Sequence, residues 1–408
     1  MDLAARDVDS AAVLRRGDRD QLSLALMRAR NRTLRWLAAF EEAGAPQAPP
    51  DGERFSPPHW LAGHAGWYQE YWIARHVQRS RGARADAAGV RLASIEPQAD
   101  RWWDPTQSTP AERWAMDLPG GEALRAWLAG TFETTLELLA HAADGDDGLH
   151  PYRAALHHEA GLDEAFAELA QACELPPSIT AELRAPMPVR AARAPIALPA
   201  RRWRMGSEPG GFVPDAEQGA HDVALPEFEI DAQPVSWAQF AEFVDDGGYD
   251  ERRWWSDAGW AWLQAQVATH GPRCPRYVEQ IRRGVALREQ GRLTRVPPQQ
   301  TARHLSAHEA DAWCRWAGRR LPTEAEWECA ATVAAARGFA WGDVWEWVAD
   351  RARFYPGHPG PAGLAPAGTR VLRGASWLTA PVLRHPKARR FAGPDADEAF
   401  CGFRSCAV

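Results

Sequence analysis

A proline-rich segment at residues 185–200 divides this chain into two halves with different sequence patterns. The segment holds four prolines and shows no helical periodicity, which is typical of a linker. Long apolar-periodic segments precede it, and short apolar runs between turns follow it. Because 408 residues are too many for one ordinary hydrophobic core, we expect more than one domain. The helical pattern before the segment and the short apolar runs after it together predict an α+β protein. Its predicted parts are a helical domain at 1–184, a linker at 185–200 and a second domain at 201–408.

The first half contains four segments with apolar residues at helical spacing. We expect helices at residues 20–44, 56–78, 121–143 and 150–174. The second should begin with a Ser56 N-cap followed by prolines in its first turn. Four amphipathic helices with one long crossover predict a four-helix bundle, and the interior of such a bundle is a common place for a metal site.

Two of these helices each carry a histidine that could serve as a metal ligand. If the second and fourth helices pack side by side, His64 and His158 can meet across the interface. Paired ligands on one helix usually lie four residues apart, but the residue four positions after His158 is Leu162. The fourth helix therefore offers one good ligand. The alternative is that both are core histidines, hydrogen-bonded to a carboxylate such as Glu70 or Glu164.

The second half reads as short strands, tight turns and capped helices. Ser236, Ser306 and Thr323 are predicted helix N-caps, and Thr323 is followed by Glu326 in a capping-box pattern. The chain has 21 tryptophans, many of them in pairs or in short loops. Large aromatic side chains of this kind pin loops and build apolar pockets with polar N–H edges, so we expect a compact, loop-rich domain.

Composition excludes several classes of protein. The formal net charge of −7 and the absence of a long Lys or Arg run give no reason to expect nucleic acid or an anionic membrane as a partner. No window reaches ~18 apolar residues, and the first residues lack a signal-peptide core, so we expect a cytoplasmic protein. None of the six cysteines forms a C-x-x-C pair. We expect Cys173, Cys314 and Cys329 to be buried thiols rather than members of a disulfide framework.

An ordered set of motifs after residue 200 resembles a known family. The motifs are Met-Gly-Ser at 205–207, Pro-Val-Ser at 234–236, Arg-Leu-Pro-Thr-Glu-Ala-Glu-Trp-Glu at 320–328, Trp-Gly at 341–342, Val-Trp-Glu-Trp at 344–347, Leu-Arg-Gly-Ala-Ser-Trp at 372–377 and Gly-Phe-Arg at 402–404. Together they resemble the formylglycine-generating-enzyme/sulfatase-modifying-factor domain, which has a C-type-lectin-like fold. The resemblance covers residues 201–408.

The first half resembles a DinB-type four-helix bundle. Joined to the C-terminal domain, it makes the whole chain similar to the non-heme iron ergothioneine and selenoneine synthases. Asp-Asp-Gly-Gly-Tyr-Asp at 245–250 with Trp-Trp-Ser at 254–256 is similar to that branch, and the ending at 390–407 is most similar to its selenoneine-synthase side. The resemblance implies Fe(2+) held by three histidines, with O2 and a thiol or selenosugar donor acting on the imidazole of a histidine betaine.

Carried over position by position, the resemblance implies two metal ligands, His64 and His158. Leu162 stands at the place of the third ligand, two residues before Glu164, and a leucine cannot bind iron. Family members also carry a tyrosine pair before the Leu-Arg-Gly strand. Here residues 357–364 lack tyrosine and leave Tyr355 as the nearest candidate for a catalytic role.

The resemblance also implies substrate-binding residues. Arg113 matches a basic position that holds the carboxylate of the sulfur donor; a surface arginine stacked on Trp114 is the alternative. Arg390 stands where relatives have an asparagine that binds the betaine. Arg389, Arg390 and Phe391 are candidates for substrate binding, and exposed salt-bridged arginines are the alternative for the first two. We expect Glu324, Asp343 and Glu346 to be structural, through capping and buried Trp N–H bonds.

Two functions therefore compete. The first is an oxidoreductase that uses Fe(2+) and O2 to form a C–S or C–Se bond on a histidine betaine. The second is a degenerate paralogue that keeps the fold and pocket as a binding or accessory protein. Copper-dependent formylglycine formation is excluded, because the paired cysteines of that enzyme are missing upstream of Gly402. The residues leave open whether sulfur or selenium is handled, which donor is used and the oligomeric state.

Overall fold

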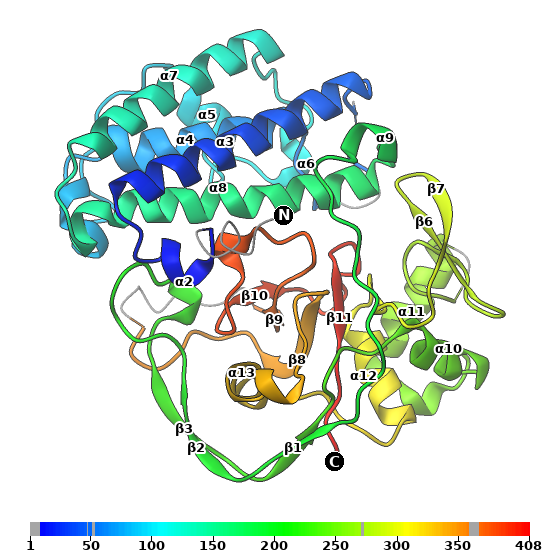
Figure 1. The fold of residues 1–408 in the computed structure, drawn as a ribbon. Coiled ribbons are helices and arrows are strands. Elements are labelled where there is room, and N and C mark those ends of the chain that lie inside the picture. The colour runs from blue at the N-terminus through cyan, green and yellow to red at the C-terminus, as the bar shows by residue number, and fades with distance from the viewer. Residues whose placement is uncertain (1–8, 47, 51–53, 271–272, 359–366) are drawn as a thin grey trace. The chain divides into compact units, whose positions relative to one another are not determined.

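The structure is a computed structural model that describes residues 9–46, 48–50, 54–270, 273–358 and 367–408. It forms two compact units, which we describe separately (Figure 1). The N-terminal unit comprises Met1–Ala185, Gly210–Phe212 and Thr379–Leu383, and the C-terminal unit comprises Pro186–Pro209, Val213–Leu378 and Arg384–Val408.

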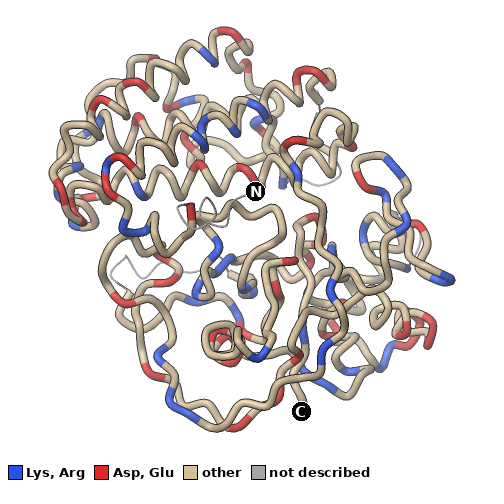
Figure 2. The backbone as a smooth tube through the Cα atoms, in the orientation of Figure 1, with Lys and Arg blue, Asp and Glu red and all other residues tan. Residues whose placement is uncertain are grey.

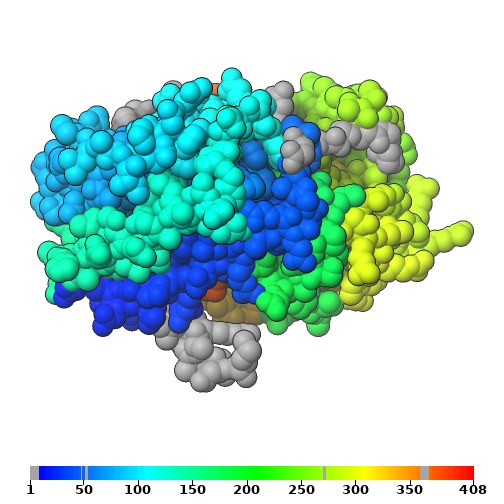
Figure 3. Space-filling view, turned by 90° about the horizontal axis from the view of Figure 1, so that it is seen from above, coloured from blue at the N-terminus to red at the C-terminus, as the bar shows by residue number. Residues whose placement is uncertain are grey.

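The N-terminal unit is built on four long helices, which confirms the predicted bundle. They are α3 (Arg19–Glu42), α4 (Pro58–Gln69), α7 (Gly121–Ala140) and α8 (Asp146–Ala172). Helix α3 packs against α7 and α8, and α4 packs against the same two helices. Figure 3 shows α3 in blue and α7 in cyan to green at the surface. The shorter elements are α2 (Ala11–Leu14), η2 (Arg79–Arg84), α5 (Ala99–Trp103), α6 (Pro110–Arg113), α9 (Pro177–Thr180) and η6 (Pro381–Leu383).

The second helix differs from the prediction at both ends. Its N-cap is Pro57 rather than Ser56, and the Ser56 hydroxyl accepts a hydrogen bond from Arg113 Nη1 at 2.9 Å. At the other end, α4 passes into a π-helical turn, η1 (Glu70–Ala74), closed by a bond from Arg75 N to Glu70 O at 2.8 Å. The helical segment therefore ends at Ala74, short of residue 78.

A buried carboxylate ties three of the long helices together. Glu159 of α8 accepts hydrogen bonds from Arg30 Nε (2.8 Å) and Thr33 Oγ1 (3.0 Å) of α3, and from Gln69 Nε2 (2.6 Å) of α4. The Arg30 and Glu159 side chains are almost fully buried. A buried ion pair with these additional hydrogen bonds fixes how the helices pack against one another, because removing either partner would leave an unpaired charge in the interior.

The C-terminal unit contains short strands and capped helices, as predicted. One sheet has the order β10-β9-β8-β11, in which β11 runs parallel to β8 and the other pairs are antiparallel. Its strands are β8 (Trp345–Arg351), β9 (Arg370–Gly374), β10 (Arg389–Ala392) and β11 (Cys401–Phe403). Strands β5 (Val278–Gln280), β6 (Val285–Glu289) and β7 (Arg292–Val296) form a second, antiparallel sheet.

Two further pairs of strands complete the unit. Strand β2 (Arg201–Met205) pairs with β3 (His221–Leu225), and β1 (Ile196–Leu198) pairs with β4 (Phe228–Ile230). The last part of the predicted linker thus contributes a strand. The helices are η3 (Asp215–Glu217), α10 (Trp237–Asp245), η4 (Arg252–Trp254), α11 (Asp257–His270), α12 (Ala307–Trp316), α13 (Glu324–Val333) and η5 (Ala335–Arg337). Complete capping boxes at Ser236, Ser306 and Thr323 confirm the predicted starts of α10, α12 and α13.

The expected structural acids and thiols also lie in this unit. Trp327 Nε1 donates to Glu346 at 2.9 Å, and Asp343 accepts hydrogen bonds from Arg190 and from Thr301. All six cysteines are free thiols; Cys314 and Cys329 are buried, whereas Cys173 is only half-buried. Figure 2 shows the two signs of charge interspersed along both units. Within the described residues, no helix is both long and apolar enough to cross a membrane.

Candidate metal and substrate site

His64 lies on α4 with its ring held in one orientation. Its Nδ1 is 2.9 Å from the backbone carbonyl oxygen of Trp103. A carbonyl can only accept, so Nδ1 carries the proton and Nε2 keeps its lone pair. The ring stacks on Trp60 (centroids 4.7 Å apart) and on Trp67 (5.6 Å). Histidines that bind a metal through one ring nitrogen typically make such a hydrogen bond with the other nitrogen, which fixes the tautomer.

His158 on α8 meets His64, as the helix patterns predict. The two ring centroids are 4.7 Å apart, with an interplanar angle of 76°. The His158 ring stacks on Tyr68 at 3.9 Å, and its Nε2 is buried without a hydrogen-bond partner among the described residues. Glu70, the carboxylate suggested for the alternative, accepts instead from Ser94 Oγ and Ile95 N. The reading of His64 as a core histidine bound to a carboxylate is therefore wrong.

Both histidines are neutral near pH 7. Burial lowers the pKa of His64 to about 4, with a smaller contribution from the nearby Arg113 guanidinium and an opposing one from the Trp103 carbonyl. Burial, and then the proximity of His64, holds the pKa of His158 well below its usual 6.5. A neutral imidazole is the form that binds a metal ion, so the donor chemistry of the pair fits a metal.

Among the residues that the structure describes, none supplies a third ligand beside the pair. Leu162 lies one helical turn beyond His158, on the same face of α8. The neighbouring acids are engaged elsewhere: Asp163 accepts from Trp36 Nε1 at 2.6 Å and from Arg32, and Glu164 accepts from Thr379 Oγ1 at 2.8 Å. Across the described parts of the chain, no group of three or more His, Cys, Asp or Glu could hold a metal ion. The residues fit an ion held by two imidazoles.

Aromatic side chains around the pair were not singled out by the sequence patterns. Trp103 stacks on Trp127 with centroids 4.3 Å apart. Gly63 lies against Trp103, where a Cβ atom would come within 1.9 Å of the indole Nε1. The Trp102-Trp103 pair was the available signal, but its backbone role depends on α5 packing against α4, and sequence spacing does not report such a contact.

Arg113 is buried close to the same cluster. Its guanidinium carbon lies 3.6 Å from the centre of the Trp60 ring, and the residue is 8% exposed. It donates to Ser56 Oγ and to the Ser108 carbonyl, both at 2.9 Å, and has no ion pair with a described carboxylate. The alternative of a surface arginine stacked on Trp114 is wrong. A buried cation without a counter-charge is suited to binding an anionic ligand group.

The remaining predicted residues lie in the C-terminal unit, around Glu324. The Tyr355 hydroxyl donates to Glu324 at 2.9 Å and accepts from Arg373 at 3.2 Å, and burial raises the pKa of Tyr355. Arg389 is buried, is bonded to Glu324, and lies 3.9 Å from the Tyr355 ring centre and 4.9 Å from that of Phe391. Arg389 is thus salt-bridged but not exposed. A substrate could bind its guanidinium only by displacing Glu324.

Arg390 is half-buried in β10, opposite Leu372 of β9. Of residues 357–364, the segment in which the resemblance implies a tyrosine pair, residues 359–364 lie outside the described residues.

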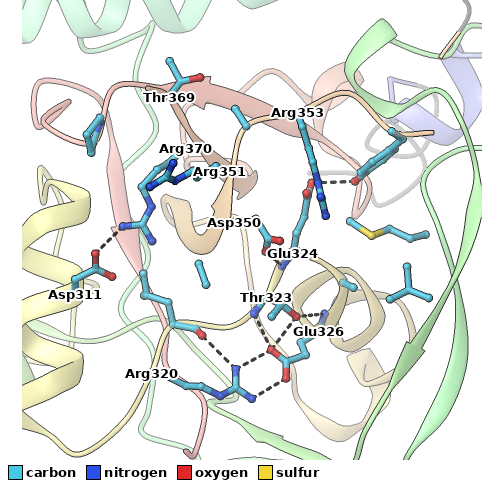
Figure 4. A pocket seen from close by; sticks show the side chains of 18 of the residues that line it. Asp311, Arg320, Thr323, Glu324, Glu326, Asp350, Arg351, Arg353, Thr369 and Arg370 are labelled. Atoms are coloured by element: carbon cyan, nitrogen blue, oxygen red, sulfur yellow. Dashed lines mark hydrogen bonds and ion pairs between the residues drawn. The ribbon is translucent and has the colours of Figure 1, made fainter. Parts of the chain in front are cut away.

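A pocket of about 1450 Å³ opens beside this cluster, within the C-terminal unit (Figure 4). Tyr355 and Glu324 lie in its wall, where the Asp350 carboxylate accepts from Glu324 N at 2.6 Å. Burial raises the pKa of Asp350. Two ion pairs also line the pocket, Arg370 with Asp311 and Arg320 with Glu326, both at 2.7 Å.

Comparison with known proteins accounts for both units. The sulfatase-modifying factor enzyme 1-like domain matches residues 180–343 and 338–407, more than half of the chain. The chain belongs to the sulfatase-modifying factor enzyme 1-like family. The DinB superfamily matches residues 25–172, which contain the histidine pair. Both parts of the predicted resemblance are confirmed.

Relatives of this sulfatase-modifying factor enzyme 1-like protein include proteins that match it along almost the whole chain. It is 29% identical to a hercynine oxygenase of Mycolicibacterium smegmatis, over 95% of this chain and 98% of that protein. A hercynine oxygenase of Mycobacterium tuberculosis is also 29% identical, with coverages of 94% and 98%. The formylglycine-generating enzyme of Streptomyces coelicolor is 30% identical but covers 53% of this chain and 89% of its own length. The similarity to the hercynine oxygenases therefore covers both the DinB part and the sulfatase-modifying factor part of this chain.

Proposed function

We propose that this protein is an Fe(2+)- and O2-dependent oxidoreductase that joins a chalcogen donor to the imidazole carbon of a histidine betaine, of which hercynine is one. The observation that carries the proposal is the pair His64 and His158. Two neutral imidazoles meet edge to face. One has a fixed tautomer, and the other has a buried nitrogen without a hydrogen-bond partner in the described part of the chain. The likeness to hercynine oxygenases over 95% of the chain supports the choice of substrate.

The two histidines would hold the iron through their Nε2 atoms. The Trp103 carbonyl keeps the proton of His64 on Nδ1 and so holds Nε2 ready to bind. A ferrous ion held there would supply the O2 chemistry and leave coordination positions for substrate atoms. Trp60, Trp67 and Tyr68 stack on the two imidazoles, fix their planes and exclude water from their faces.

Arg113 is the residue that would bind the carboxylate of a donor. Its guanidinium is buried, has no counter-charge among the described side chains and contacts the same Trp60 that stacks on His64. A charge-assisted, two-pronged bond to a carboxylate would compensate this cation. The predicted contributions of Arg390 and Phe391 to substrate binding remain part of the proposal. The predicted catalytic role of Tyr355 and the predicted substrate-binding role of Arg389 also remain part of the proposal. Both side chains are bonded to Glu324.

The decisive experiment begins with protein purified anaerobically under reducing conditions. Bound Fe(2+) is measured, and O2 uptake is then followed with trimethylhistidine and, in separate arms, a thiol donor or a selenosugar. Iron-dependent O2 uptake that needs both substrates supports the proposal, and the more active donor identifies the chalcogen. The cytoplasm, where free thiols stay reduced, is the location that we assign to this activity.

The degenerate-paralogue alternative makes a different prediction in the same experiment. A protein that binds trimethylhistidine but takes up no O2, with or without added iron, would be a binding or accessory protein. Calorimetric titration of trimethylhistidine into His158→Ala and into the parent protein then tests whether the histidine pair takes part in that binding.

A further inference from the structure

The pocket of the C-terminal unit contains an unusual group of cations that the proposed reaction does not use. Arg351, at the end of β8, lies directly opposite Arg370 of β9 in the antiparallel register. Arg353 follows two residues later, and all three line the pocket. Figure 4 shows Arg351 and Arg370 side by side, and Arg353 farther along the pocket beside Glu324. Like charges directly opposite one another destabilise a sheet, so this arrangement calls for compensation by negative charge.

The protein supplies only part of that compensation. Arg370 donates to Asp311 at 2.7 Å and to the Val348 carbonyl. The side chains of Arg351 and Arg353 are exposed and make no hydrogen bond or ion pair with any described residue.

The other carboxylates of the pocket wall are already engaged. Glu326 is paired with Arg320, and Glu324 is bonded to Arg373 and Arg389. Asp350, the acid next to Arg351, accepts a backbone N–H bond and has Arg353 nearby. Two guanidinium groups therefore face the cavity beside a third that has a single carboxylate partner.

We propose that this pocket binds a small organic phosphate, with Arg351, Arg353 and Arg370 contacting its phosphate group. A phosphate brings up to two negative charges and several acceptor oxygens, which suit the fork-shaped donors of two or three arginines. A monocarboxylate brings one charge and two oxygens. The volume of about 1450 Å³ leaves room for an organic part beside the phosphate. The site is distinct from the histidine pair and does not depend on the proposed reaction.

The test is calorimetric titration of inorganic phosphate into the full chain at constant ionic strength, with sodium chloride as the reference salt. The parent is compared with the double variant Arg351→Ala/Arg353→Ala. We expect the double variant to bind phosphate about tenfold or more weakly, because it loses charge-assisted hydrogen bonds. The matched control is Arg292→Ala/Arg295→Ala, which removes the same charge from exposed positions on β7 and should leave binding unchanged.

Three outcomes would overturn the proposal. The first is phosphate binding no tighter than that of chloride at equal ionic strength. The second is equal affinity in the parent and the Arg351/Arg353 variant. In a parallel titration, citrate that binds as tightly as phosphate through the same arginines would show a general polyanion site and overturn the phosphate assignment. Circular dichroism verifies that each variant is folded, and none of these readouts depends on iron or O2.

Discussion

The imidazoles of His64 and His158 lie edge to face across two helices, with ring centroids 4.7 Å apart and planes at 76°. The Trp103 carbonyl orients the first ring, and Tyr68 stacks on the second. A metal ion bound at both rings would have two protein ligands, since Leu162 occupies the position one turn beyond His158. Metal affinity is therefore the property most sensitive to residue 162.

Leu162→His should raise metal affinity by about an order of magnitude or more, because it adds a third imidazole on the face of α8 that carries His158. Anaerobic titration with Co(2+), followed by its visible absorption, measures the change. Leu162→Asn, which is polar but lacks an imidazole, is the control and should bind like the parent. Equal affinity in Leu162→His and Leu162→Asn would show that residue 162 does not point toward the pair.

Acid should destabilise the protein through His64. Its folded pKa of about 4 lies below the ordinary 6.5, so the unfolded chain takes up the proton first. The contribution of the neutral ring to stability is complete above about pH 6.5 and falls as the pH drops toward 4, by about 3 kcal/mol in total. Urea unfolding at a series of pH values measures it. His64→Gln should lose this part of the pH dependence. If the free energy of unfolding of that variant fell with pH as steeply as that of the parent, His64 would not be the group responsible.

Gly63→Ala should destabilise the N-terminal unit by about 1–3 kcal/mol, since the new Cβ would overlap the Trp103 indole, which must then move. The same shift should weaken the bond from His64 to the Trp103 carbonyl. Gly161→Ala is the matched control: it lies on α8 with no atom within 4 Å of the added Cβ and should stabilise by up to about 1 kcal/mol. Thermal unfolding compares the two, and equal effects would argue against close packing at Gly63.

Glu159→Ala should be among the most damaging single changes, at about 3–5 kcal/mol, because it leaves the buried Arg30 without its counter-charge. Glu182→Ala, which breaks an exposed pair with Arg35, should change stability by about 1 kcal/mol or less. Chemical denaturation followed by tryptophan fluorescence tests both. A small effect at Glu159 would mean that Arg30 finds another partner.

Arg113→Leu should raise the KM for a carboxylate-bearing donor about tenfold or more, if the proposed function holds, while Fe(2+) binding stays near the parent value. Arg113→Lys should restore part of the affinity, since it returns the charge without the planar fork. Steady-state O2 uptake at varied donor concentration, together with iron titration, separates the two effects. A loss of iron binding would instead assign Arg113 a structural role near His64.

Much of the helical unit could be predicted because the sequence patterns that indicate helices involve residues close together in the chain. Apolar spacing located α3, α7 and α8 to within a few residues, and placing one histidine on each of two neighbouring helices predicted their meeting. The capping boxes at Ser236, Ser306 and Thr323 were readable for the same reason. Each depends on residues three or four apart, whose geometry a helix determines.

The features that could not be predicted depend on contacts between distant segments. The carbonyl that orients His64 belongs to Trp103, 39 residues away, and the burial of Arg113 depends on Ser56 and Trp60. Strand β1 has only three residues in a proline-rich segment and exists because β4 pairs with it. Likewise, the bond of Arg389 to Glu324 joins residues 65 positions apart, and the spacing of residues in the sequence does not predict contacts over such a separation.

The π-helical turn after α4 is connected through helix α5 to the carbonyl that orients His64. Between Glu70 O and Arg75 N it holds one residue more than an α-helical turn, so the extra residue is accommodated within a single turn. Arg75, which closes the turn, donates to Asp100 of α5 at 2.7 and 2.8 Å. Helix α5 ends at Trp103, so the residue that closes the π turn also holds the short helix whose last carbonyl selects the tautomer of His64.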